Sequence, residues 1–226
     1  MTAPQRAFAL LALLPAALAA QASVTGQVTI LERPGARTTD LANAVIWLEP
    51  VGGSRNLPPS AAQIQMESRT FVPRVRVVPA GSTVEFPNQD PFRHNVFSKA
   101  GPRDFDLGLY ARGESRGTRF ERAGVYPIFC NIHARMVAFV VAVPSPWVTQ
   151  PSASGSFALA GVAPVTYALR AWHDRGGTLA REVVVAAGGP AAPAPLALQL
   201  DARGWRFVQH RNKFGQEYAA EGRDRY

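Results

Sequence analysis

The chain has 226 residues, a formal net charge of +8 and an apolar fraction of 47%. This length fits one large domain or two small ones, and the apolar fraction is too high for an intrinsically disordered chain. The basic residues are mostly isolated arginines and form no long run, so we expect no nucleic-acid binding. The charge excess instead favours an acidic protein partner. The 19 glycines and 19 prolines favour short strands and turns over long helices.

Residues 1–22 have the pattern of a signal peptide. Arg6 gives a short positive region, an apolar stretch follows over 7–20, and Ala19 and Ala22 end small-x-small cleavage sites. The alternative is a membrane anchor, but the apolar stretch is shorter than the ~20 residues of a membrane span. The segment therefore predicts export to the periplasm, without stable insertion into a membrane.

The mature chain begins with alternating apolar and polar residues over 24–50, which predict two strands joined by a polar turn. A loop over 52–61 follows. Short strands resume at Gln63 and continue to Ser98, and residues 99–115 are predicted as a long polar loop. Two strands joined by a glycine turn are expected over 117–130. The β-branched run 136–144 fits a buried strand.

After a joint rich in proline and serine, strand patterns return over 156–162, 166–174, 178–189 and 194–202. The tail 201–226 is polar and aromatic, and the pattern leaves open a short helix or disorder. The mature sequence shows no amphipathic helix longer than two turns. It therefore predicts an all-β chain made of sandwiches.

A candidate metal site lies in "FCNIHARM", residues 129–136, which holds Cys130, His133 and Met136. A lone cysteine at the end of a strand is more often a small buried hydrophobic residue than a ligand. His94, in the upstream segment "NQDPFRHNVFS", completes a set of one thiolate, two imidazoles and one thioether. Such a set, with the thioether as a weak axial ligand, is the arrangement of a blue-copper electron-transfer site. Zinc is the alternative, although it more often takes a second cysteine or a carboxylate than a methionine.

The expected strand pattern would bring these residues together. His94 begins a predicted strand after a turn marked by Asn88, Asp90 and Pro91, and Cys130 ends another predicted strand. The ends of a sandwich are where loops from different strands converge on a rigid scaffold.

The segment 63–143 resembles the cupredoxins, through "VVPAGSTVEFPNQDPFRHNVFS" and "GVYPIFCNIHARM". Its short Cys-x-x-His-x-x-Met loop looks like that of the amicyanin and plastocyanin-like proteins, including those of methylamine utilisation. The resemblance implies an eight-stranded Greek-key sandwich with one type 1 copper per chain. It implies that His94, Cys130, His133 and Met136 bind the copper. It also implies that the backbone N–H of Asn95 donates to the Cys130 sulfur, with possible help from the Asn95 side chain.

The flanking segments 23–50 and 152–200 resemble a carboxypeptidase-regulatory-like, or transthyretin-like, sandwich. The motifs are Gly26-Gln27-Val28, "AVIWL" at 44–48, "GSFAL" at 155–159 and "YALRAW" at 167–172. The residue before Tyr167 is usually glycine in that family, and here it is threonine. The resemblance implies that the cupredoxin is inserted into the other sandwich, or that the two pack end to end. Alternatively, residues 24–50 form an extra pair of cupredoxin strands.

Two functions follow from these patterns. The first is a carrier of single electrons between periplasmic redox proteins, with a cytochrome c or a quinoprotein dehydrogenase as the partner. The second is a non-redox copper-binding or protein-interaction module of the periplasm or cell envelope. An enzyme is not expected, because a second, catalytic copper needs several more histidines, and beyond the two candidate ligands the chain has His173 and His210.

The electron-carrier hypothesis places the docking face around His133. We expect the apolar part of this face to consist of Pro91, Phe92, Ile132 and Ala134, with the basic Arg135 beside them. Further arginines, Arg93, Arg112 and Arg116, are expected at its rim. Transient redox partners meet through small interfaces in which charge affects the association rate more than the affinity.

Overall fold

The structure is a computed structural model, and it describes residues 22–53, 55, 57–186 and 194–218. The predicted signal peptide, 1–22, lies outside the described residues except for Ala22, which begins the first strand. In the described part of the chain, no helix is long and apolar enough to cross a membrane. The helical element described there is a short 3-10 turn, η1 (Leu41–Asn43).

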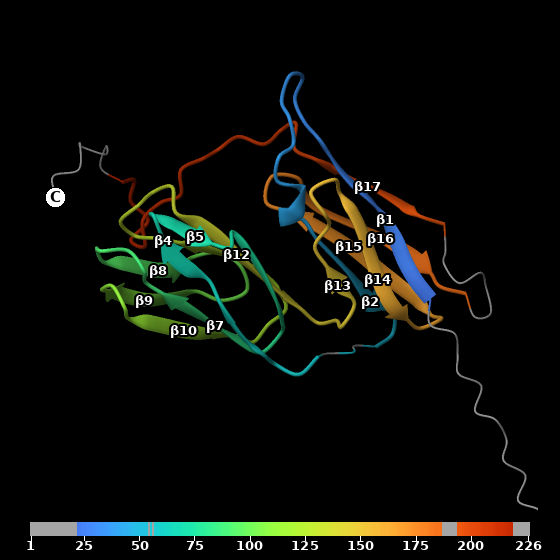
Figure 1. Ribbon diagram of the computed structural model, residues 1–226, viewed down its shortest axis with the longest axis horizontal. Coiled ribbons are helices and arrows are strands. Elements are labelled where there is room, and N and C mark those ends of the chain that lie inside the picture. The colour runs from blue at the N-terminus through green and yellow to red at the C-terminus, as the bar shows by residue number, and fades with distance from the viewer. Residues whose placement is uncertain (1–21, 54, 56, 187–193, 219–226) are drawn as a thin grey trace, which may run out of the picture.

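The described chain forms two β-sandwiches that lie side by side (Figure 1). We call residues 61–143 the central sandwich, and strands β1, β2 and β13–β17 the flanking sandwich. The strands of the central sandwich are β3 (Ala61–Gln63), β4 (Gln65–Glu67), β5 (Thr70–Val72), β6 (Val75–Pro79), β7 (Ser82–Pro87), β8 (His94–Ser98), β9 (Phe105–Tyr110), β10 (Ser115–Phe120), β11 (Gly124–Phe129) and β12 (Val137–Val143). Those of the flanking sandwich are β1 (Ala22–Leu31), β2 (Val45–Pro50), β13 (Val148–Thr149), β14 (Ser156–Val162), β15 (Thr166–His173), β16 (Gly177–Val184) and β17 (Leu196–Asp201).

The central sandwich packs a three-stranded sheet, β10-β7-β3, against a five-stranded sheet, β6-β12-β11-β8-β9. The hairpin of β4 and β5 closes one end. Alternating residues of both sheets fill the core, as in β7, where Ser82, Val84 and Phe86 are buried and the residues between them are partly exposed. The predicted fold class is confirmed: the chain is all-β, with a Greek-key sandwich and a second, smaller sandwich.

The flanking sandwich pairs strands from the beginning of the chain with strands from its end. β1 pairs antiparallel with β14 and parallel with β17. β2 pairs antiparallel with β13 and β15, and β16 completes that sheet. The central sandwich therefore lies between β2 and β13 in the sequence, while β2 and β13 are neighbours in one sheet.

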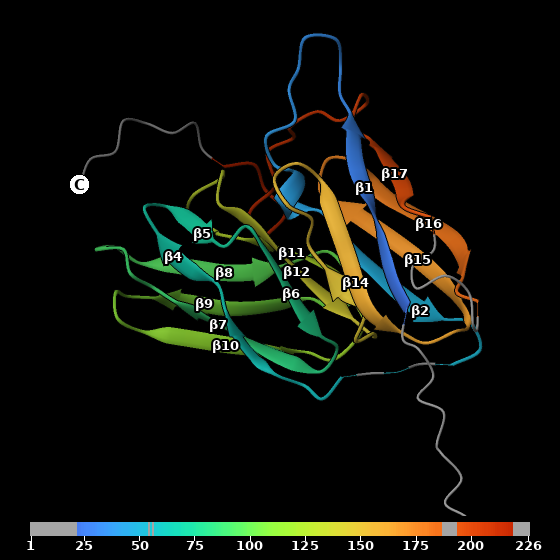
Figure 2. The same ribbon diagram turned by 45° about the vertical axis from the view of Figure 1, so that its right-hand side comes forward.

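The two sandwiches lie against each other (Figure 2). They are in contact through an apolar cluster and an ion pair. The buried members of the cluster come from both sandwiches: Val45, Trp47, Val75, Val141, Val143 and Trp172. At its edge, Arg74 of the central sandwich binds the Asp174 carboxylate at 2.5 Å. The Phe139 and Trp172 rings pack edge to face with their centroids 5.1 Å apart, so side chains of the two sandwiches are in direct contact.

The polar loop predicted over 99–115 is wrong in part, because Phe105–Tyr110 forms strand β9. This strand lies at the edge of the five-stranded sheet and pairs with β8 alone. An edge strand with a solvent-facing side tolerates polar residues such as Asp106 and a glycine at 108, which hide its pattern in the sequence.

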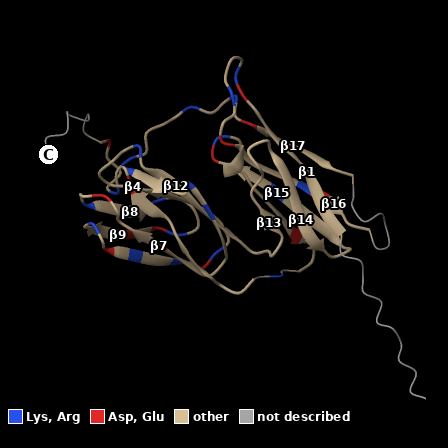
Figure 3. Cartoon of the chain, viewed as in Figure 1, with Lys and Arg blue, Asp and Glu red and all other residues tan. Residues whose placement is uncertain are grey.

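The tail from Ala202 to Tyr218 forms neither a helix nor a strand. It leaves β17 in the flanking sandwich and crosses to the central sandwich, where it ends beside β8 and β11 (Figure 1). Lys and Arg positions are spread along the tail and over both sandwiches, without one basic block (Figure 3).

Candidate metal centre

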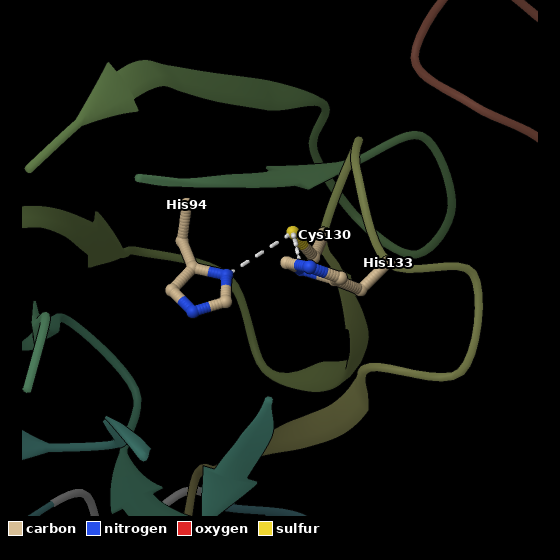
Figure 4. Close-up of side chains that lie close together, drawn as sticks. All are labelled: His94, Cys130 and His133. Carbon is tan, nitrogen blue, oxygen red and sulfur yellow. Dashed lines mark hydrogen bonds between the residues drawn. The ribbon is translucent and has the colours of Figure 1, made fainter. Parts of the chain in front are cut away.

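Three metal-binding side chains meet at one end of the central sandwich. His94 begins β8, Cys130 directly follows β11, and His133 lies in the loop before β12. Cys130 Sγ lies 3.6 Å from His94 Nδ1 and 3.7 Å from His133 Nδ1 (Figure 4). All three ligand atoms lie within 4.8 Å of one another.

These distances suit a metal between sulfur and nitrogen as well as they suit a weak S–H···N hydrogen bond. A metal about 2.3 Å from sulfur and about 2.0 Å from nitrogen, with an angle near 120°, places the two ligand atoms about 3.7 Å apart. Both observed distances agree with this value. One thiol and two imidazoles at this spacing can hold a borderline or soft metal such as copper or zinc.

The His94 imidazole is fixed by Asp90. Its Nε2 lies 2.7 Å from Asp90 Oδ2, and because an ionised carboxylate only accepts, Nε2 carries the proton. The lone pair of Nδ1 therefore faces Cys130. Burial lowers the pKa of His94, although Asp90 acts in the opposite direction, so the ring is neutral and able to bind a metal at neutral pH.

Asp90 also holds the turn of the β4–β5 hairpin. Its two oxygens accept the backbone N–H groups of Ser68 at 2.6 Å and Arg69 at 2.9 Å. Both residues have positive φ, 53° and 57°, which costs energy in residues other than glycine. Burial alone would raise the pKa of Asp90, but the hydrogen bonds from Arg69, His94 and Ser68 outweigh it and lower that pKa.

Cys130 is fully buried, and burial raises the pKa of its thiol. Backbone N–H groups of Asn95, Ile132 and His133 hydrogen bond to it and act in the opposite direction. The thiol therefore stays protonated until a cation replaces its proton, whereas those N–H groups would stabilise a thiolate bound to a metal.

Met136 closes the loop that follows Cys130. Its N–H donates to the His133 carbonyl at 3.0 Å, and its carbonyl accepts from the Cys130 N–H at 3.3 Å. The side chain is 1% exposed and packs in the same core cluster as Cys130. The loop thus brings the thioether residue, the thiol and His133 into one short segment.

The expected contribution of Asn95 divides into two parts. Its backbone N–H donates to Cys130, as the family resemblance implies. Its side chain does not turn to the sulfur, because Nδ2 donates to Asp106 Oδ1 at 2.7 Å. A register shift in the β8–β9 pairing follows Asn95.

The residues expected at the docking face differ in exposure. Pro91, Ile132 and Arg135 are exposed, Phe92 is half-buried and Ala134 is buried at 2% exposure. Ala134 therefore does not belong to the surface, because the turn from His133 to Met136 folds it inward. Phe92 contacts both candidate imidazoles, with ring centroids 5.2 Å from His94 and 5.6 Å from His133.

A surface pocket lies over His133. Its apolar walls come from Phe92, Leu109 and Ile132, and its basic edge from Arg69 and Arg93. Leu109 and Ile132 are 46% and 40% exposed, so an apolar patch faces solvent beside His133. Sequence patterns did not predict Leu109 or Arg69 at this face, because both come from segments distant from the ligand loop.

A second group of possible ligands, Asp40, His173 and Asp174, lies in the flanking sandwich. His173 is fully buried. Its Nδ1 accepts the Arg175 N–H at 3.2 Å, and the Asp40 carboxylate binds the Arg175 guanidinium at 2.6 Å. These groups already bind arginine, so the cluster forms an ion-pair network.

No protein-family model matches the chain, and no curated protein matches it. Among solved structures, it is similar to a Cu-containing nitrite reductase from Thermus scotoductus SA-01, with 26% identity over 51% of this chain and a TM-score of 0.36. This match covers 28% of the nitrite reductase. A purple cupredoxin from Nitrosopumilus maritimus shares 25% identity over 36% of this chain and 99% of its own, with a TM-score of 0.33. Amicyanin from Paracoccus versutus shares 23% identity over 43% and 97%, with a TM-score of 0.35. These structural neighbours are cupredoxins at low identity and partial coverage.

Proposed function

We propose that this protein binds one type 1 copper per chain and carries single electrons between redox proteins. The observation that carries the proposal is the position of Cys130 Sγ, 3.6 and 3.7 Å from the Nδ1 atoms of His94 and His133. These three residues would bind the copper, and Met136 would add a weaker thioether ligand. The metal would supply a Cu(II)/Cu(I) couple.

The protein's own contribution is a rigid and dry set of ligands. Asp90 holds the His94 ring, and the backbone hydrogen bonds of Met136 hold the loop. Because Cys130, His94 and Met136 are at most 1% exposed, water has little access to three of the four ligands. Ligands that cannot move favour rapid electron transfer, because little reorganisation accompanies a change of charge.

Partner docking would occur over the pocket beside His133. His133 is half-buried, and its ring lies in the wall of the pocket next to the exposed Ile132. We propose Pro91, Phe92, Ile132, Leu109 and Arg135 as the contact face. An apolar centre with arginines at its edge suits a weak interface with an acidic redox protein, such as a cytochrome c or a quinoprotein dehydrogenase.

The place of action would be the periplasm, because residues 1–22 have the pattern of a signal peptide. We also propose that 23–50 and 152–200 form one regulatory-like domain into which the copper domain, 63–143, is inserted. Support comes from β1, which pairs with both β14 and β17. In this arrangement the flanking domain would serve attachment or docking, and the chain would be a carrier and not an enzyme.

The test is the absorption spectrum of purified protein loaded with Cu(II). We expect an intense thiolate-to-copper charge-transfer band in the visible range that disappears on reduction with ascorbate. A colourless protein that binds zinc as readily as copper would overturn the proposal and favour a non-redox binding module.

Two variants and a control assign the ligands. Cys130→Ser should remove the band, since the thiolate is the source of the charge transfer. Met136→Gln should keep copper bound and lower the reduction potential, because a harder axial ligand favours Cu(II). Met66→Gln serves as the control for a buried methionine outside the loop. A strong band retained in Cys130→Ser would show that the thiolate assignment is wrong.

A further inference from the structure

The tail beyond the flanking sandwich makes specific contacts with the segment that carries Cys130. It leaves β17 at Asp201, passes the exposed residues Phe207 and Val208, and reaches the central sandwich at His210 (Figure 1). Sequence patterns gave this tail no role.

The end of the tail is a preorganised turn. Asn212 accepts the N–H groups of Phe214 and Gln216 with its side-chain oxygen, at 2.9 and 3.0 Å. Its carbonyl accepts the Gly215 N–H at 2.9 Å, and Gly215 adopts a positive φ of 80° that suits glycine. The turn brings both Lys213 and Tyr218 into contact with one segment of the central sandwich.

That segment is the start of the ligand loop. The Tyr218 hydroxyl donates to the Cys130 carbonyl at 2.6 Å. The Lys213 N–H donates to Asn131 Oδ1 at 2.9 Å. Two adjacent residues of the loop, one of them a proposed copper ligand, are thus bound by the tail through directional hydrogen bonds.

Aromatic packing supports these bonds. The His210 ring stacks on Phe129 with centroids 4.3 Å apart and an angle of 28° between the planes. The Tyr218 ring packs against His210 edge to face at 5.2 Å. Phe129 directly precedes Cys130, so the tail contacts three consecutive residues of the chain, 129–131.

The tail also reaches the segment of the other buried ligand. Lys213 Nζ binds Asp106 Oδ2 at 2.7 Å, while Asp106 Oδ1 accepts from the side chain of Asn95, which follows His94. Lys213 therefore contacts the ligand loop directly and the residue after His94 through Asp106.

We infer that residues 210–218 form a clasp that positions the ligand loop, and that Tyr218 is its main positioning residue because it fixes the Cys130 carbonyl. Without the clasp, the loop would be held by the hydrogen bonds between Cys130 and Met136 and between His133 and Met136. The effect on a bound metal rests on the proposed function, but the effect on the loop does not.

The experiment compares full-length wild-type protein with Tyr218→Phe, which keeps the ring and removes the hydroxyl. The matched control is Phe207→Ala, which changes an aromatic residue of the tail that is 57% exposed and lies outside the clasp. Amide hydrogen exchange of metal-free protein is measured at Cys130 and Met136, whose N–H groups close the loop. Amides of β2 and β15 report opening of the flanking sandwich, and amides of β7 and β10 report opening of the central sandwich as a whole.

Tyr218→Phe removes the hydrogen bond to the Cys130 carbonyl and the 3.3 Å contact of the hydroxyl with His210 Nδ1. Loss of the bond to Cys130 should speed exchange at Cys130 and Met136 by about 2- to 10-fold. The control and the amides of β2, β7, β10 and β15 should keep wild-type rates. Equal rates in Tyr218→Phe and wild type would overturn the inference. A similar increase at every amide would also overturn it, because it would show a general loss of stability.

A second readout uses protein loaded with copper. Tyr218→Phe should shift the reduction potential or the charge-transfer band, while Phe207→Ala should leave both unchanged. A band and potential identical to wild type would refute the positioning of the metal by the clasp, even if copper binds as proposed. If wild type binds no copper, the proposed function fails, and the exchange rates of the metal-free protein still decide whether the clasp exists.

Discussion

Replacement of Asp90 should affect both the stability of the protein and its affinity for copper. The Asp90 carboxylate accepts three hydrogen bonds, from the N–H groups of Ser68 and Arg69 and from His94 Nε2. Each hydrogen bond to a charged group contributes about 1.5–3 kcal/mol, so three at the lower value give about 4.5 kcal/mol. Relief of the cost of burying the carboxylate reduces the expected loss in Asp90→Ala to about 3 kcal/mol.

Asp90→Asn should destabilise the protein less than Asp90→Ala does. The amide oxygen of the new side chain can still accept hydrogen bonds from His94 and Arg69, while the NH₂ group faces the Ser68 N–H. We expect a loss of about 1–2 kcal/mol in the free energy of unfolding. Asp104→Ala is the control, since Asp104 is 58% exposed and its change should stay within about 0.5 kcal/mol. Urea unfolding of the metal-free proteins provides these values.

Measurements at acid pH distinguish stabilisation by the Asp90 charge from stabilisation by packing of the Asp90 side chain. The pKa of Asp90 lies below its ordinary value of 3.8 in the folded protein, so its contribution is present above pH 3.8 and is lost as the pH falls through the folded pKa. The stability difference between wild type and Asp90→Asn should therefore narrow on acidification below pH 3.8. A constant difference would contradict the role of the charge.

Copper binding gives the second measurement on Asp90. Loss of the group that orients a ligating histidine typically costs about 10- to 100-fold in metal affinity. Removing a negative charge beside His94 favours Cu(I), and a tenfold larger loss for Cu(II) would raise the potential by about 59 mV. Unchanged copper affinity and potential in Asp90→Ala would refute the reasoning.

Two further predictions concern the pH dependence of the free energy of unfolding and the close packing at Gly26. Burial lowers the pKa of His94 and of His210, so the free energy of unfolding of the metal-free protein should fall as the pH drops below 6.5, by about 1.4 kcal/mol per pH unit for a fully neutral buried histidine. His94→Gln should weaken the dependence of the free energy of unfolding on pH, measured by urea unfolding at a series of pH values. An unchanged slope would contradict a lowered pKa of His94. Gly26→Ala places a Cβ 2.2 Å from the Leu196 carbonyl oxygen and should destabilise the protein by about 1–3 kcal/mol in thermal unfolding. Gly53→Ala, where a Cβ meets open space, should be neutral, and equal melting temperatures for the two variants would contradict the clash.

The meeting of His94, Cys130 and His133 could be predicted, because residues of this chemistry are rare in this chain and their spacing is short. Cys130 and His133 are three positions apart, and His94 lies in a strand that follows a readable turn. The approach of His94 to Cys130 then needs only that β8 and β11 are neighbours, which the structure shows through the pairing of Phe97 with Phe129.

Other parts of the site could not be predicted, because they depend on contacts between distant segments. Tyr218 and Cys130 are 88 positions apart, and no local pattern indicates their hydrogen bond. Strand β9 was missed although Phe105, Leu107 and Leu109 alternate with Asp106 and Gly108, because aspartate and glycine have low strand propensity. The burial of Ala134 follows from a single backbone turn that sequence patterns do not specify.

The pairing of β1 with β14 and β17 sets an order of assembly. Strands of the central sandwich are close together in the sequence, so it can fold as soon as residues 61–143 are available. β1 and β2 must wait for partners that lie more than a hundred residues later, and closing so long a loop is slow. The tail follows β17 in the chain, so its bonds to Cys130 and Asn131 also join segments that are far apart in the sequence. If the loop binds copper as proposed, a metal captured before the tail is in place would meet a more accessible site than a metal that exchanges into the finished protein.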